Sequence, residues 1–159
     1  SMVDWQPYFS ATPVPTPAAQ ADVAKAVEQA KAPLREDVQK LLAERQGQAP
    51  EQDVIDIGDD GNTAFGPILV VSDVPPSSTA GTYTVSFAIN ALKEWSPPAD
   101  GKPAFFPFAS NTSSGWFCVD QRDPAQPIVF IDFNYDPDEQ GAITPVAPDV
   151  ATMLAKLHY

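Results

Sequence analysis

Side chains that commonly act as nucleophiles or general bases are scarce in this chain of 159 residues, which has one His, His158, and one Cys, Cys118. His158 is the second residue from the C-terminus, where chains usually fray, so it is poorly placed as the base of a Ser-His-Asp or Cys-His arrangement. Cys118 lies in the apolar run 116–119, which favours a small buried side chain over a nucleophile. A His/Cys zinc site and an internal disulfide are both excluded. We therefore expect no catalytic residue, no metal and no cofactor.

Carboxylates are abundant, and two Asp-rich segments partly match calcium-binding loops. Residues 132–136 match ligand positions one, three and five of an EF-hand loop, but Pro137 stands where the loop needs Gly and Ile143 where it needs Glu. The segment 56–61 keeps the Gly but lacks a ligand at the third position. We therefore expect both segments to be Asp-rich turns and not metal sites.

The charge balance excludes several kinds of partner. The chain has 21 acidic and 9 basic side chains, so its formal net charge is -12. Nucleic acids and anionic membranes are bound through Lys and Arg, so we expect neither as a partner. The longest purely aliphatic run, residues 68–71, is far shorter than the roughly 20 residues that span a bilayer.

The excess negative charge lies after residue 46, because residues 18–46 contain five acidic and five basic side chains. Acidic side chains that cluster in loops can be only a solvated face, but they can also form a negative surface that attracts a basic protein. We expect core packing for Trp116, but an exposed Trp116 would add an aromatic anchor. The carboxylates expected to contact a partner are Asp59, Asp60, Asp120, Asp123, Asp136, Asp138 and Glu139.

Helices are expected near both ends of the chain. Residues 1–16 are rich in proline and predict an extended surface arm, which aromatic side chains could pin onto the domain. Thr16-Pro17 is typical of an N-cap followed by Pro at the first helical position. Apolar residues at helical spacing, interrupted at Pro33, predict two helices or one kinked helix over 17–46. An apolar stripe after Pro148-Asp149 predicts a short last helix.

The middle of the chain predicts short strands between turns. The segment 82–89 alternates apolar and small polar residues, which is typical of a half-buried strand. Helices first, strands in the middle and a helix last predict an α+β domain over residues 17–159, with the helices packed on a mainly antiparallel sheet of about 4–6 strands. The strands are expected at residues 54–57, 65–72, 82–89, 116–119 and 128–133.

The second half of the chain resembles a known family. Residues Phe106–Ala109, Gly115–Asp120 and Pro127–Phe130 are similar, in order and spacing, to a "pfa" segment, a "G-x-hydrophobic-x-x-D" strand and a "p-V-hydrophobic" strand of the SMI1/KNR4 family of the SUKH superfamily. Residues Ala147–Val150 and Leu154–Leu157 are similar to the short helix that ends the family's domain. The resemblance covers about residues 55–157.

This resemblance implies a protein-binding α+β domain. Many bacterial members are similar to immunity proteins, which act in the cytoplasm and neutralise a cognate toxin of contact-dependent or type VI secretion systems. A nuclease toxin must hold phosphates and is basic, so an acidic inhibitor has the complementary sign. The first hypothesis is therefore a non-enzymatic immunity protein whose acidic surface occludes a basic, nuclease-like toxin. The second is a general scaffold or regulatory adaptor without a toxin partner, and the third is an enzyme of unknown type.

The N-terminus is expected to hold no secretory signal. Ser1 precedes Met2, which we expect to be the native start, and the following residues include neither a basic region nor an apolar stretch. A single unpaired Cys agrees with a reducing compartment. We therefore expect a cytoplasmic protein.

Overall fold

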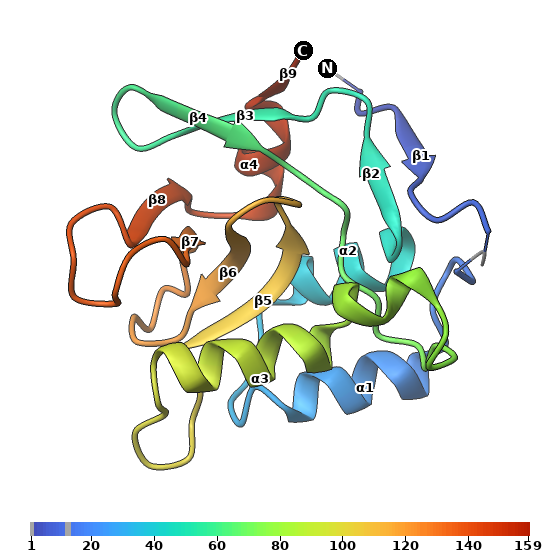
Figure 1. Cartoon of the computed structure of the whole chain (residues 1–159), viewed down its shortest axis with the longest axis horizontal. Helices are drawn as coiled ribbons and strands as arrows, with labels where there is room; N and C mark the ends of the chain where they lie inside the picture. Colours follow the sequence, from blue (N-terminus) through green and yellow to red (C-terminus); the bar gives the residue numbers. More distant parts are fainter. Residues whose placement is uncertain (1, 12–13) are drawn as a thin grey trace.

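Four neighbouring antiparallel strands form the main sheet of this α+β protein (Figure 1). The computed structural model describes residues 2–11 and 14–159, so residues 1, 12 and 13 of the predicted arm lie outside the described residues. The predicted class, helices with a mainly antiparallel sheet of about 4–6 strands, is confirmed. In spatial order the sheet consists of β5 (Phe105–Ser110), β6 (Gly115–Asp120), β7 (Ile128–Asp132) and β8 (Ile143–Ala147).

Two smaller sheets attach the ends of the chain to this body. In the first, β3 (Val54–Ile57) pairs with β4 (Gly61–Ala64) and with β9 (Leu157–His158). In the second, β1 (Trp5–Pro7) pairs with β2 (Gln48–Pro50). The proline-rich N-terminal segment thus supplies a strand, and its Phe9 is buried.

Of the two alternatives predicted for this region, two helices or one kinked helix, the structure has two separate helices: α1 (Gln20–Glu28) and α2 (Glu36–Arg45). The prediction that Thr16-Pro17 starts the first helix is wrong. Ala18 is buried and its N–H donates to the Ala43 carbonyl in α2 at 2.7 Å, so the chain is bonded to α2 before α1 begins. The last helix, α4 (Val150–Ala155), begins after Asp149 as predicted.

The prediction of a strand over residues 82–89 is also wrong. A 3-10 helix (Thr79–Tyr83) leads into α3 (Val85–Trp95), and the Thr84 hydroxyl accepts the N–H of Phe87 at 3.1 Å as an N-cap. In a half-buried strand the apolar side chains of the segment, Phe87 among them, would face the core, but Phe87 is 44% exposed. The buried side chains of α3 follow a helical stripe and are Val85, Ala88, Ile89 and Leu92.

The segment 65–72 is buried over residues 65–70 but does not form the predicted strand. Among the residues that the structure describes, it makes only isolated bridges, from Ile68 to Ala109 of β5 and from Val70 to Thr84. Pro67 has no N–H to give to a ladder. The N–H groups of Ile68, Leu69 and Val70 go to three different segments, at the carbonyls of Gln48, Phe108 and Tyr83.

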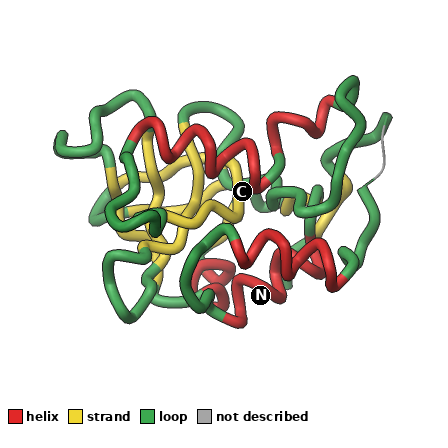
Figure 2. Tube along the Cα trace, turned by 90° about the horizontal axis from the view of Figure 1, so that it is seen from below, coloured by secondary structure: helices red, strands yellow, loops and turns green. Residues whose placement is uncertain are grey.

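Both faces of the main sheet are covered. Alternate side chains of β5 to β7 point to opposite faces, so Phe106 and Phe117 join the large core with α1 and α2, while Phe105 and Cys118 join a smaller cluster with Leu92 of α3. Helices α1 and α3 lie along the bottom of Figure 1 and face the viewer in Figure 2. A hydrogen bond of 3.2 Å from Gln29 to Ser86 joins the end of α1 to the start of α3.

Candidate partner-binding surface

The turn of the β3–β4 hairpin carries Asp59 and Asp60, both exposed, and lies against β8. The backbone N–H of Gly58 in this turn donates to the Pro145 carbonyl at 3.0 Å. Gly58 has a φ of +60°, and a Cβ there would lie 3.1 Å from the Thr144 methyl group, so both conformation and space favour glycine. The hairpin turn is thereby fixed beside β8.

The loop between β7 and β8 carries a second group of the predicted carboxylates. Asp136, Asp138 and Glu139 are exposed, and the Glu139 carboxylate accepts the N–H of Asp136 at 2.8 Å. The loop leads into β8, beside which the β3–β4 turn is fixed, and both segments project to the left in Figure 1. We call these five residues the acidic edge: Asp59, Asp60, Asp136, Asp138 and Glu139.

The two segments that form the acidic edge contain no Lys or Arg, over residues 51–64 and 133–147. Beside the hairpin, Nε2 of His158 on β9 lies 3.0 Å from Oδ1 of Asp56 on β3. The hydrogen bond to Asp56, followed by one to the Tyr159 carbonyl, raises the pKa of His158. The acidic edge itself keeps a dense negative charge, which attracts a cationic surface.

Asp120 was expected at the partner surface, but its side chain is only 10% exposed. It pairs with Arg122 through two contacts of 3.0 Å, Nε to Oδ1 and Nη2 to Oδ2. The hydrogen bond to Asp120 raises the pKa of Arg122 against the effect of burial. Because its own arginine neutralises it, Asp120 offers no free charge to a partner, and we leave it out of the acidic edge.

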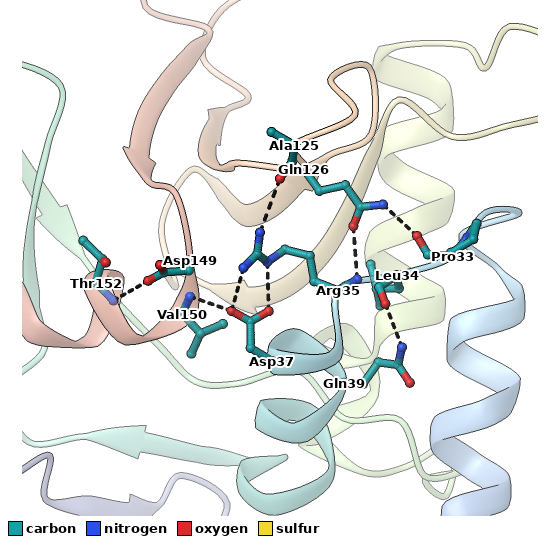
Figure 3. A network of polar contacts seen from close by, with 10 residues as sticks. All are labelled: Pro33, Leu34, Arg35, Asp37, Gln39, Ala125, Gln126, Asp149, Val150 and Thr152. Atoms are coloured by element: carbon teal, nitrogen blue, oxygen red, sulfur yellow. Dashed lines mark hydrogen bonds and ion pairs between the residues drawn. The ribbon is translucent and has the colours of Figure 1, made fainter.

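Asp123 is exposed but lies in the β6–β7 turn, where its carboxylate accepts the N–H of Ala125 at 2.9 Å. This turn is docked on the linker before α2. Gln126 donates to the Pro33 carbonyl at 2.7 Å and accepts the N–H of Arg35 at 3.1 Å (Figure 3). Since the β6–β7 turn and the β7–β8 loop are at opposite ends of β7, Asp123 is not part of the acidic edge.

Trp116 lies on β6, half-buried, opposite Ile131 of β7. Its ring meets Phe133 edge-on at 4.9 Å between centroids. Phe133 is the first residue of the β7–β8 loop, so Trp116 lies at the base of the loop that carries three carboxylates of the acidic edge. This is a suitable place for an aromatic anchor.

A groove of about 790 Å³ between α2 and α4 was not anticipated from the sequence. Apolar side chains of Trp5, Leu41 and Leu154 line it, and charged side chains of both signs surround them. The Arg45 guanidinium lies 5.3 Å from the Trp5 ring. The apolar stripes of α2 and α4 are visible in the sequence, but no sequence signal shows that they face each other.

Arg35 and Asp37 lie at this groove (Figure 3). Two contacts join them, Nε to Oδ1 at 2.8 Å and Nη2 to Oδ2 at 3.0 Å, and the Asp37 carboxylate also accepts the N–H of Val150 at 3.0 Å. Burial raises the pKa of Asp37, but the hydrogen bonds from Arg35 and Val150 together with the charge of Arg35 lower it below its usual value. These contacts hold α2 and α4 together.

The two residues with nucleophilic or basic chemistry lie in different sheets. Cys118 in β6 is fully buried, and burial followed by the charge of Asp120 raises the pKa of its thiol well above the usual value. His158 in β9 is exposed. Among the described residues, no group of three or more His, Cys, Asp or Glu side chains is placed to hold a metal ion. The Asp132 carboxylate instead accepts the N–H of Asn134 at 2.9 Å, as in an Asx turn.

Within residues 2–11 and 14–159, no helix combines the length and the apolar character that crossing a membrane requires. Comparisons with protein-family models, with curated proteins and with solved structures found no match to this chain. We therefore infer function from the charges, contacts, cavities and sequence pattern of the chain itself.

Proposed function

We propose that this chain is a bacterial immunity protein of the SMI1/KNR4 type, which binds a cognate secreted toxin in the cytoplasm and occludes it. The acidic edge is the observation that carries the proposal, because it brings together five exposed carboxylates from two segments far apart in the sequence. The resemblance to the SMI1/KNR4 family over residues 55–157 supports the same function.

The partner is a basic, nuclease-like toxin. A nuclease holds phosphates with Lys and Arg, and these side chains are complementary to an inhibitor whose net charge is -12. Negative charge concentrated at one edge accelerates the encounter and orients the two proteins. Trp116 adds apolar contact beside the carboxylates. Inhibition by covering the toxin requires no chemical step from this chain.

Co-expression tests the proposal. Bacteria that express the candidate toxin encoded beside this gene are expected to grow only when this protein is also expressed. The quadruple variant D59K/D60K/D136K/D138K is expected to lose protection. The control E28K/D73K makes substitutions of the same kind at exposed positions in α1 and in the loop that follows residues 65–72, and it keeps protection. Growth without this protein, or full protection by the quadruple variant, would contradict the proposal.

The salt dependence of the binding rates distinguishes long-range electrostatic attraction between the two proteins from the contacts of the bound complex. The association rate of the purified pair is expected to fall about tenfold between low salt and physiological salt, because screening shortens the range of surface charge. The dissociation rate changes less, because screening acts chiefly on encounter. An association rate that is insensitive to salt would remove the acidic edge from the mechanism.

An adaptor without a toxin partner is the second candidate. The groove between α2 and α4 favours it, because this groove has an apolar lining and is large enough to hold a side-chain cluster of another protein. Several weakly bound partners, without rescue from any neighbouring toxin, are the results expected for an adaptor. The variants L154E and D59K/D60K distinguish binding at the groove from binding at the acidic edge, since each changes only one of these two surfaces.

A further inference from the structure

A pocket of about 320 Å³ at the start of β6 is lined by hydroxyl, amide and aromatic groups. It lies between the loop that joins β5 to β6 and the first residues of the β7–β8 loop. Its volume is at the small end of the range for ligand pockets, which is about 300–1,000 Å³. The side chains that matter for binding are Tyr83, Trp116 and Phe133 on the apolar side and Ser113, Ser114 and Asn134 on the polar side.

Asn111 holds the loop before β6 in one conformation. This side chain is 1% exposed, and its Oδ1 accepts the N–H groups of Ser113 at 3.1 Å and Ser114 at 2.9 Å and, in addition, that of Gly115 at 3.1 Å. Its Nδ2 donates to the Thr63 hydroxyl at 3.0 Å. The loop that carries the serine hydroxyls is therefore ordered before any ligand arrives, which lowers the entropy lost on binding.

The aromatic side of the pocket is fixed as well. Phe133 stacks on Trp95 at 5.4 Å with an angle of 15° between the rings, and it meets Trp116 edge-on. The indole N–H of Trp95 donates to the Tyr135 carbonyl at 2.8 Å, which holds the stack in place. Rigid aromatic rings provide a surface against which the C–H groups of a ligand can pack.

The polar groups of the pocket have spare hydrogen-bonding capacity. Ser113, Ser114 and Asn134 use their backbone N–H groups within the loops. Their hydroxyl and carboxamide groups, and the indole N–H of Trp116, have no partner among residues 2–11 and 14–159. Hydroxyls and amides both donate and accept, so together they match a ligand that carries several hydroxyl groups.

Charge narrows the class of ligand further. The side chains that line the pocket are all uncharged, in a chain whose net charge is -12. The Asp132 carboxylate bonds to the N–H of Asn134 at the edge of the pocket, and Asp136 follows shortly afterwards. This negative surround disfavours an anion, while the lining offers no carboxylate to pair with a cation.

We propose that this pocket binds a neutral carbohydrate of one or two rings, which packs its C–H face on Trp116 and Phe133 and bonds through its hydroxyls to Ser113, Ser114 and Asn134. The site shares Trp116 with the proposed partner surface, but it differs from the acidic edge in chemistry, because all its lining side chains are neutral. It stands whether or not the chain is an immunity protein.

Titration of the ¹⁵N-labelled full chain tests this site, with maltose, cellobiose and N,N′-diacetylchitobiose as neutral probes and glucuronate as the anionic probe. At least one neutral probe is expected to give saturable NMR shifts, confined to the Trp116 indole N–H and to the amides of residues 112–116 and 133–134. Glucuronate is expected to give no saturable shift in the same range.

Two variants measure the proposed contacts. S113A/S114A is expected to weaken binding about tenfold, since it removes two hydroxyls and leaves the backbone bonds to Asn111 in place. W116F keeps an aromatic ring but loses the indole N–H, and we expect it to weaken binding several-fold. The controls S77A and W5F change exposed or distant residues of the same types and leave binding unchanged. Amide dispersion of each variant confirms that it is folded.

Three results would overturn the proposal. The first is the absence of saturable shifts with all three neutral probes at concentrations up to about 50 mM, because a site with a weaker affinity would not be a specific one. The second is binding by S113A/S114A and W116F that equals wild type. The third is binding of glucuronate as tight as that of the neutral probes.

Discussion

The carboxylate of Asp37 accepts the backbone N–H of Val150 at 3.0 Å, so the first turn of α2 is bonded to the first turn of α4 (Figure 3). The same carboxylate pairs with Arg35. One side chain thus joins two helices from opposite ends of the chain. Asp37 and Val150 both line the groove between these helices.

Asp37→Ala is expected to lower the free energy of unfolding by about 1–2 kcal/mol, because it removes a charged acceptor from a helix N-terminus and removes the carboxylate that pairs with Arg35. The value is modest because both side chains are partly exposed. Urea denaturation measures it. Glu36→Ala, at the neighbouring exposed position with no side-chain hydrogen bond among the described residues, is the control and is expected to change stability much less.

The same carboxylate contributes to acid sensitivity. The pKa of Asp37 in the folded protein lies below 3.8. Its contribution to the free energy of unfolding is therefore complete above that value and is lost as pH falls through the folded pKa. Asp37→Asn cannot titrate, and its loss of stability between about pH 5 and pH 2 is expected to be smaller than in wild type. An identical pH dependence of stability in Asp37→Asn and in wild type would show that the pKa of Asp37 is not lowered by folding.

Thr84→Ala is expected to destabilise the protein by about 1 kcal/mol, because the Thr84 hydroxyl accepts the Phe87 N–H at the start of α3. Thr84→Ser keeps the oxygen and is expected to restore most of the loss. Thermal unfolding of both variants makes the comparison. If Ser is no better than Ala, packing of the Thr methyl group and not capping is the important contribution.

Gly115→Ala is expected to prevent normal folding or to cost several kcal/mol, since a Cβ at Gly115 would overlap the Ile131 carbonyl of the paired strand β7. Gly81→Ala is the matched control, because a Cβ at Gly81 meets nothing within 4 Å. Expression level and circular dichroism compare the two. Wild-type stability of Gly115→Ala would contradict the close pairing of β6 and β7.

The His158–Asp56 contact predicts a pH-dependent bond between β9 and β3. Because the folded pKa of His158 is raised above 6.5, the contact stabilises the protein fully below the unfolded pKa and is lost as pH rises through the folded pKa. NMR titration of the imidazole is expected to show a pKa above 6.5 that returns toward this value in Asp56→Asn and at high salt. An unchanged pKa in the variant would exclude the ion pair.

Local signals made some elements predictable. The two N-terminal helices have apolar stripes separated by Pro33, and Asp149 is a good N-cap whose carboxylate accepts the Thr152 N–H at 2.7 Å. The strands at 54–57, 116–119 and 128–133 have runs of β-branched and aromatic residues between turns. In each case, the residues that specify the element lie within it or next to it.

The segment 82–89 shows where local patterns are ambiguous. A strand with period two and a helix with a spacing of four both predict that Val85 and Ile89 are buried. These two positions therefore do not distinguish a strand from a helix. Ala88 and Leu92 complete the helical stripe, and the Thr84 cap starts it. The burial of Ala88 and exposure of Phe87 reflect packing of α3 on β5, which lies outside the segment.

The sequence by itself determined the α+β class, the negative charge and its location after residue 46, because these depend on composition and on short-range pattern. Asp120 and Asp136 look alike in the sequence, and only the tertiary structure separated them: one is buried against Arg122 and the other is exposed. The bond between Gly58 and Pro145 likewise brings two acidic segments to one edge. Strand pairing and burial join residues that are far apart in the chain, and such contacts leave no mark in a local pattern.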